Sequence, residues 1–409
     1  MADVVTVFLR NRAELLLIRR SDAVGTYTGR WAGISGYLEG DSADAVSDAR
    51  RELREEVNVT DARLVRAGEP LEVTDEGHEW TVHPFLFACD HREVNPNWEL
   101  ETVDWVPATT ILDRETVPCL WATYRRVAPS VETIANDTEH GSAYVSLRAL
   151  EVLRDEAAVL DSVDELAETA RTLRAARPSM AAVRNRVNRV MSRSSDRTEQ
   201  VLEAAIEIIA AVQDADTMAA ATAAEVVGEY DGAILTISRS GTVRAALDTI
   251  DTPTVIAASR PGGEGITVAD DLAAAGHDVT VIPDAAVAYA VTSSELDIVA
   301  ALVGADTVDP DGRVLNKVGT LGCALACAAA NIPCYVVTAA DKISHRTDLA
   351  LEFDSSNGLA PTAWRPLFDV TPGELVEGYI TEEGLLDRDG LADQAAERAR
   401  WATWDADEQ

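Results

Sequence analysis

Residues 233–242 read Ala-Ile-Leu-Thr-Ile-Ser-Arg-Ser-Gly-Thr, an apolar run with β-branched residues followed at once by small polar residues. Such a run is typical of a strand buried on both faces, and the polar residues after it are typical of a turn. Similar runs recur between helical stretches and Gly/Asp-rich turns, at Thr254–Ala258, Val279–Ile282, Ile298–Val303 and Tyr335–Thr338. Apolar strands that alternate with helices predict βαβ units, and therefore a parallel sheet covered by helices on both faces.

Polar residues directly follow three of these predicted strands. Ser238–Thr242 come after the first strand, Asp306 follows the strand that ends at Val303, and Lys342 follows the last one. Ligands of parallel sheets bind beyond the carboxyl ends of the strands. We therefore expect these residues to lie on the face of the sheet where a site is built.

Two other kinds of sequence precede this region. Strands are expected at Val4–Leu9, Leu15–Ile18, Trp80–Ala88 and Asp104–Val106, around a charged helix at Ala43–Val57. Long Ala/Leu/Glu/Arg stretches at helical spacing then run from about 131 to 227, after a linker-like Pro-Ser pair. The chain thus divides into an α/β domain (1–128), a helical segment (129–227), a Rossmann-like parallel-sheet domain (228–385) and an acidic tail, helical and partly frayed (386–409).

The charge of the chain is extreme. Its 70 acidic and 35 basic residues give a formal net charge of −35 over 409 residues. A surface this negative repels phosphate backbones, so we expect no nucleic-acid partner. Lysine occurs only at Lys317 and Lys342. An arginine-biased genome explains the missing lysines but not the acid excess, so we interpret the composition as halophilic, adapted to a cytoplasm of high salt.

The five cysteines show no metal-ligand spacing, and we expect them to be small buried side chains in a reducing compartment. No basic-then-apolar leader and no apolar stretch of bilayer length is present. We therefore expect a cytoplasmic protein with no membrane association.

A glycine-containing loop at 33–41 leads into a helix with three carboxylates, Glu52, Glu55 and Glu56. Their spacing places all three on one helical face, where mutual repulsion favours a bound cation. Hard oxygen ligands suit Mg²⁺ or Mn²⁺, with a phosphorylated substrate completing the shell. In a chain this acidic, a solvated acidic helix is the alternative.

The sequence Arg51-Glu52-Leu53-Arg54-Glu55-Glu56-Val57-Asn58-Val59 resembles the end of the Nudix box of the Nudix hydrolases. The resemblance covers most of residues 3–125 and implies an α/β/α sandwich. It makes Glu55 and Glu56 metal ligands, Glu52 a ligand or base-orienting partner, and Arg51 a brace, with Glu99 or Glu101 as a further carboxylate. The chain departs from the box at Asn58, which replaces a glycine but tolerates a left-handed backbone, and in the lengths of the segments on either side of Asp41.

Several segments between about 130 and 385 resemble, in order and spacing, one superfamily. It contains ribose-1,5-bisphosphate isomerase, methylthioribose-1-phosphate isomerase and the alpha, beta and delta subunits of translation initiation factor 2B. The segments are 236–240, Ser259-Arg260-Pro261, 283–287, 304–306, Asn316-Lys317-Val318-Gly319-Thr320 and 368–372. The resemblance implies dimers or higher homo-oligomers and a phosphorylated small-molecule ligand. The ligand contacts that we infer from this resemblance and the strand ends are His140, Gly141, Ser142, Arg177, Ser240, Gly241, Thr242, Asn316, Lys317 and Lys342.

One departure concerns the chemistry of this second region. The isomerases use a cysteine and an aspartate as acid/base partners; Asp306 occupies the aspartate position, but Ser238 stands at the cysteine position. A serine hydroxyl is far less acidic than a thiol. Three hypotheses follow: a Mg²⁺-dependent Nudix-type hydrolase of a nucleoside-diphosphate-linked metabolite with a sugar-phosphate- or nucleotide-binding domain, a non-catalytic regulator similar to the initiation-factor subunits, and a sugar-phosphate isomerase.

Overall fold

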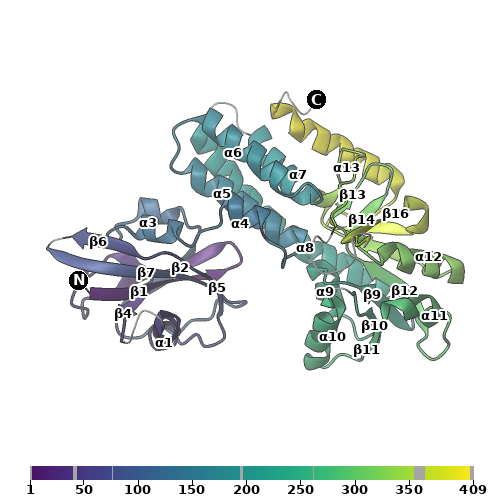
Figure 1. The fold of residues 1–409 in the computed structure, drawn as a ribbon, viewed down its shortest axis with the longest axis horizontal. Coiled ribbons are helices and arrows are strands. Elements are labelled where there is room, and N and C mark those ends of the chain that lie inside the picture. The colour runs from purple at the N-terminus through teal and green to yellow at the C-terminus, as the bar shows by residue number, and fades with distance from the viewer. Residues whose placement is uncertain are drawn as a thin grey trace. The chain divides into compact units, whose positions relative to one another are not determined.

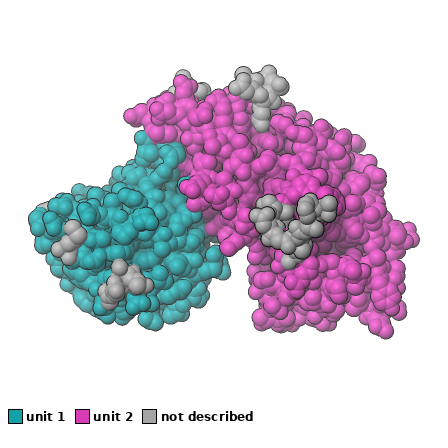
Figure 2. All heavy atoms as spheres, viewed as in Figure 1, with its two compact units in different colours: residues 1–130, 154–159 teal, residues 131–153, 160–409 magenta. Residues whose placement is uncertain are grey.

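The structure is a computed structural model that describes residues 2–39, 44–75, 77–193, 197–260, 262–353 and 364–405. It divides into two compact units, which Figure 2 colours separately. Unit 1 comprises residues 1–130 and 154–159, and unit 2 comprises residues 131–153 and 160–409. Gly40 and Asp41 of the glycine loop, and Pro261, lie outside the described residues.

Unit 1 is built on one sheet of eight strands in the order β3-β2-β1-β7-β5, with β4 paired to β1, β6 to β7 and β8 to β2. Strands β1 and β7 are parallel, and the other pairs are antiparallel. The strands are β1 Ala2–Asn11, β2 Glu14–Arg20, β3 Trp31–Ala32, β4 Ile34–Tyr37, β5 Arg63–Ala67, β6 Leu71–Asp75, β7 His78–Ala88 and β8 Leu100–Val106.

Helices cover both faces of this sheet because alternate residues of a strand point to opposite faces. Val7 and its neighbours at two-residue spacing pack with α1 (Ala45–Val57), whereas Phe8 and Leu17 pack with α3 (Leu120–Arg125). Figure 1 shows α1 and α3 on opposite sides of the sheet. The short helix α2 (Thr110–Asp113) precedes α3. The predicted α/β/α sandwich is therefore confirmed.

Unit 2 begins with helices, as the spacing predicts. They are α4 Val131–Ala135, α5 Ser142–Ala157, α6 Val163–Ala176, α7 Ala181–Ser192 and the 30-residue α8 Thr198–Val227; the last turn of α5 falls in unit 1. A seven-stranded sheet follows in the order β11-β10-β9-β12-β15-β17-β18, parallel except at β18. Its strands are β9 Ala233–Ile237, β10 Thr254–Ala257, β11 Val279–Ile282, β12 Ile298–Val303, β15 Cys334–Val337, β17 Gly378–Thr381 and β18 Gly384–Leu386.

Two apolar clusters lie on the two faces of this parallel sheet. Helices α8, α9 (Gly241–Leu247) and α10 (Glu264–Ala274) pack on one face. On the other face pack α11 (Val287–Ala290), α12 (Thr320–Ala330) and α13 (Arg388–Trp401) (Figure 1). Strands β9, β10 and β15 are buried throughout, as expected of a doubly covered sheet, whereas the edge strand β11 exposes Thr280 and Val281.

A small antiparallel sheet and four short 3-10 helices complete unit 2. The sheet has the order β13-β14-β16, and one 3-10 helix carries Lys342 directly after β15. These elements are β13 Thr307–Val308, β14 Val314–Lys317, β16 Phe368–Thr371, η2 Asp284–Ala286, η3 Ala340–Lys342, η4 Gly373–Leu375 and η5 Ala402–Trp404.

The tail is helical, as expected: Leu391 and Arg398 of α13 are buried, and Asp405 pairs with Arg174, while residues 406–409 lie outside the described residues. One expectation from the sequence is wrong. Cys119 is exposed, while the other four cysteines are buried. It stands at the first turn of α3 with a left-handed φ of 57°, so its side chain is outside the core.

Candidate functional site

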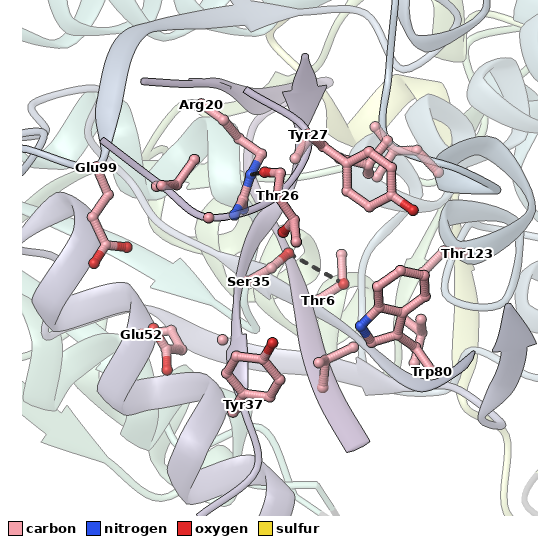
Figure 3. Close-up of a pocket in the computed structure, with 18 of the residues that line it drawn as sticks. Thr6, Arg20, Thr26, Tyr27, Ser35, Tyr37, Glu52, Trp80, Glu99 and Thr123 are labelled. Atoms are coloured by element: carbon pink, nitrogen blue, oxygen red, sulfur yellow. Dashed lines mark hydrogen bonds between the residues drawn. The ribbon is translucent and has the colours of Figure 1, made fainter. Parts of the chain in front are cut away.

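A cavity of about 550 Å³, here called the unit 1 cavity, opens beside helix α1. Figure 3 shows Glu52 and Glu99 on one side of it and Tyr27 and Trp80 on the other, with Thr6 and Ser35 between them. The Thr6 and Ser35 hydroxyls lie 3.2 Å apart. The cavity therefore combines a charged wall, a hydroxyl floor and an aromatic wall.

Glu52 and Glu99 line the charged side of the cavity, and Glu56 is a third, buried carboxylate that interacts with both of them. Glu52 and Glu56 are 7% and 3% exposed, and they are four residues apart on α1. Burial, Glu52 and Glu99 together raise the pKa of Glu56 to about 8, and burial also raises the pKa of Glu52. Each carboxylate makes its neighbour harder to ionise, which is unfavourable unless a cation lies among them.

Two features hold the Glu52 carboxylate in place. A Cβ on Gly36 of β4 would lie 1.9 Å from Glu52 Oε1, so this carboxylate occupies the space that a side chain would need. Arg51 also pairs with Glu52 at 2.9 Å, with Asp48 at 3.1 Å and with Glu55 at 3.5 Å. The predicted brace by Arg51 thus agrees with the structure.

The predicted face of three equivalent carboxylates is only partly formed. Glu55 lines the cavity at its rim with a side chain that is 56% exposed, whereas Glu52 and Glu56 are buried. Glu99 lines the cavity, while Glu101 pairs with Arg19 and is 53% exposed. Over the described part of the chain, no three His, Cys, Asp or Glu side chains stand ready to hold a metal ion.

The residues nevertheless fit a divalent cation. Glu56 Oε2 is buried without a hydrogen-bond partner, which is costly for an acidic oxygen and is relieved by a ligand cation. Glu52, Glu56 and Glu99 supply the oxygen donors that Mg²⁺ and Mn²⁺ prefer, with Glu55 at the rim. The local fold supports this arrangement, because Asn58 ends α1 in the left-handed conformation with φ 57°.

Sequence reasoning missed the aromatic wall. The rings of Tyr27 and Trp80 lie 5.8 Å apart, and the Tyr27 hydroxyl donates to Asp75 at 2.9 Å. These residues come from a loop and from β7, which are far apart in the chain. An aromatic residue in an otherwise polar loop is the signal that could have indicated Tyr27.

A second group of predicted residues, here called the unit 2 site, gathers around Asp306. Burial raises the pKa of Asp306, while the nearby Lys342, Ser142 and Arg177 favour its ionised form. Lys342 is buried, its Nζ donates to the carbonyl of Ala305 at 2.9 Å, and burial lowers its pKa. Four predicted positions are thus brought together: the first residue of α5, the residue after α6, the turn after β12 and η3.

The loop before α5 is tied to the same group. His140 Nδ1 lies 2.9 Å from Asp137 Oδ2, and the ring stacks on Tyr144 at 3.9 Å. Burial raises the pKa of Asp137, but hydrogen bonds from the His140 ring and backbone outweigh this and lower it to about 2. Arg177 donates to the Asp137 carbonyl. A Cβ on Gly141 would meet nothing within 4 Å, so this position is open.

The polar groups of the turn after β9 form hydrogen bonds with other residues of unit 2. Ser238 has a left-handed φ of 69°, and its N–H donates to Ser259 Oγ at 2.7 Å. Ser240 caps α9, in which Gly241 is the first residue, and lies against Gly304 of the neighbouring strand end. Thr242 is buried and donates to Asp216 at 3.4 Å. The turn lies where predicted, next to the end of β12.

The two lysines have different surroundings. Lys317 forms an ion pair with Glu264 at 2.5 Å. Asn316 donates to Thr320 at 3.0 Å. Sequence reasoning missed both Glu264 and Asp137; an acidic residue directly after a Gly-Gly pair at a helix start is the signal for Glu264.

Comparison with known proteins identifies two regions. A family model of the NUDIX domain matches residues 1–130, and a model of the initiation factor 2 subunit family matches residues 138–388. The first region holds the unit 1 cavity, and the second holds the unit 2 site. Among the described residues, no helix is both long and apolar enough to cross a bilayer.

Similar proteins match the second region. Methylthioribose-1-phosphate isomerase of Gemmatimonas aurantiaca is 39% identical over 139 residues, which cover 32% of this chain but only 40% of that protein. Ribose 1,5-bisphosphate isomerase of Haloferax volcanii is 29% identical over 293 residues, 63% of this chain and 89% of that protein. The solved translation initiation factor eIF-2B of Pyrococcus horikoshii OT3 has a TM-score of 0.57 at 26% identity, covering 63% of this chain and 94% of that one.

Proposed function

This chain belongs to the initiation factor 2 subunit family and carries a NUDIX domain ahead of that region, and on this premise we propose that it is a two-module enzyme. The unit 1 cavity hydrolyses the phosphoanhydride bond of a nucleoside-diphosphate-linked or similar metabolite. The unit 2 site binds a sugar phosphate or a nucleotide. The observation that carries the hydrolase proposal is the buried, unpartnered Glu56 Oε2 next to Glu52, which itself lines a cavity of about 550 Å³.

The carboxylates on α1 hold the cation in this proposal. Glu52 and Glu56 would be its main ligands, with Glu55 at the rim and Glu99 from the same side of the cavity as Glu52. A bound Mg²⁺ or Mn²⁺ neutralises diphosphate charge and makes a water molecule a better nucleophile. Burial raises the pKa of Glu52, and Arg51 opposes this and orients the carboxylate through the ion pair at 2.9 Å. Attack of water on one phosphorus would form a new P–O bond as the bridging P–O bond breaks. The other phosphate would leave with that electron pair, and the proton of the water would pass to solvent.

The test of this proposal is hydrolysis by the purified full chain. We expect Mg²⁺- or Mn²⁺-dependent release of a phosphate monoester from at least one member of a nucleoside-diphosphate panel at high salt. Glu56→Gln should lower kcat at least a hundredfold, and Glu55→Gln should also lower it. Glu72→Gln, which removes an exposed carboxylate of β6, is the matched control. Absence of turnover across the panel, or an unaffected Glu56→Gln, contradicts the proposal.

The unit 2 site supports a second candidate, a sugar-phosphate isomerase. Asp306 lies beside Lys342, and a ribose 1,5-bisphosphate isomerase is similar over 89% of its length. Asp306 would act as the acid/base group, and Ser238 would need an activating partner in place of a thiol. Ketose formation from ribose 1,5-bisphosphate or methylthioribose 1-phosphate, lost in Asp306→Asn, is the supporting result. No product would leave ligand binding as the function of unit 2.

A non-catalytic regulator is the third candidate, motivated by Ser238 at the cysteine position. Turnover that Glu55→Gln abolishes would exclude its purely non-catalytic form. We further propose that the protein is a cytoplasmic homo-oligomer adapted to high salt, because its net charge is −35 and it belongs to this family. Analytical ultracentrifugation at 0.1 M and 3 M salt tests the assembly.

A further inference from the structure

Lys317 forms an ion pair with Glu264, a carboxylate that is not one of the proposed ligand contacts. Lys317 Nζ lies 2.5 Å from Glu264 Oε1, and the two side chains are only 14% and 25% exposed. We propose that Glu264 is a built-in counter-ion of Lys317, a predicted ligand contact of unit 2, and that it weakens phosphate binding to this ammonium and sets its selectivity for dianions over chloride. This inference rests on the proposed binding of a phosphorylated ligand at that site.

The Glu264 carboxylate is built into its position by the backbone. A Cβ on Gly262 would lie 2.4 to 2.5 Å from three atoms of the Glu264 carboxyl group, so the carboxylate folds back over a residue without a side chain. Gly263, with φ 79°, is the N-cap residue of α10, which begins at Glu264. No side chain caps this end of the helix. The turn therefore fixes the carboxylate in front of Lys317, which lies on β14.

Half of the carboxylate has no partner of its own. Glu264 Oε2 is buried without a hydrogen bond, while Oε1 takes the ammonium. The free oxygen itself favours a donor or a cation, so the room for an anion is on the lysine. A lysine ammonium has three donors, and Glu264 takes one of those of Lys317.

The ion pair makes Lys317 selective for phosphate over chloride. With Glu264 ionised, the pair is neutral, and a chloride ion gains little by approaching Lys317 because a tethered carboxylate is already there. A phosphate dianion carries twice the charge and more acceptor oxygens, so it still competes for the two remaining donors. Removing the Glu264 charge exposes an unpaired ammonium, which should bind phosphate about tenfold to a hundredfold more tightly.

The experiment measures binding of inorganic phosphate to the full chain by ³¹P NMR titration, with EDTA present to remove metal ions. Glu264→Gln, which keeps the shape of the side chain, should lower the Kd at least tenfold in 0.1 M sodium gluconate. This gain should be at least fivefold smaller in 2 M sodium chloride than in 2 M sodium gluconate, because both salts screen charge but chloride also competes for the exposed ammonium. Asp270→Asn removes an exposed charge from the same helix and should change the Kd less than twofold. Circular dichroism verifies that each variant is folded.

The outcomes separate this inference from the proposed function. If wild type binds phosphate, Lys317→Met loses it and Glu264→Gln binds no more tightly, the counter-ion role is wrong but the phosphate site stands. If Lys317→Met binds as well as wild type, phosphate does not use Lys317, and the inference also fails. If neither wild type nor Glu264→Gln binds phosphate, both the inference and the proposed unit 2 site are refuted.

Discussion

Replacing Gly36 with alanine adds one methyl group at the point where β4 meets the Glu52 carboxylate. The new Cβ would lie 1.9 Å from Oε1 and 2.1 Å from Cδ of Glu52, about 1.5 Å short of the 3.4 Å of an ordinary contact. Gly36 pairs with Val5 in the sheet, and Glu52 lies within α1, so neither backbone can retreat easily. The carboxylate must therefore rotate away.

The size of the effect follows from this displacement. A shift of about 1 Å in a catalytic group typically costs about a hundredfold in rate, so we expect kcat/KM for the proposed hydrolysis to fall at least a hundredfold, or about 2.7 kcal/mol of transition-state stabilisation. Overpacking should also lower the free energy of unfolding by about 1 to 3 kcal/mol. The dissociation constant of Mn²⁺, measured by calorimetry, should rise in parallel.

Gly25→Ala is the matched control. Gly25 lines the same cavity, but a Cβ there would meet nothing within 4 Å. This variant adds the same methyl group without moving Glu52, so its Mn²⁺ affinity should stay within about twofold of wild type. If Gly36→Ala is folded and binds Mn²⁺ as tightly as Gly25→Ala does, the Glu52 carboxylate does not hold the cation, and our assignment of the site is wrong.

Three further predictions concern unit 2 and the cysteines. Asp341→Ala breaks buried ion pairs and should lower the free energy of unfolding, measured by urea titration, by about 3 to 5 kcal/mol. Asp348→Ala, at a 66% exposed side chain, should change this free energy by about 0.5 kcal/mol or less. Equal effects of the two substitutions would contradict the burial of Asp341. The pKa of Asp137 is lowered to about 2, so its contribution to stability is present above pH 4 and is lost as the pH falls towards 2. Asp137→Asn should therefore cost about 1 kcal/mol at pH 6, after discounting for its partial exposure, and less at pH 3; a pH-independent difference would exclude this linkage. A thiol reagent should modify one of the five cysteines in the native protein and none in native Cys119→Ser, so rapid labelling of a second thiol would refute the described burial.

The sequence by itself determined the elements that depend on local patterns. Residues 233–237 are apolar throughout because β9 is covered on both faces, and this pattern is visible without knowing what covers it. The charged helix expected at Ala43–Val57 ends at Val57 as α1 does, and Asn58 adopts the left-handed conformation that its short side chain tolerates. The rule that ligands bind at the carboxyl ends of parallel strands located Asp306 and Lys342 near each other.

The tertiary structure alone decided which charged residue faces which. Glu55 and Glu56 are neighbours in one helix, yet Glu56 is buried and Glu55 is half exposed, because the packing of α1 against the sheet is set by distant residues. Lys317 meets Glu264, 53 positions away, only because β14 and the start of α10 converge in the fold. Arg398 of the tail is buried near Asp341 for the same reason. Periodicity fixes which residues share a face, but burial and pairing depend on what packs against that face, and in a chain so rich in acids many partners satisfy the same local pattern.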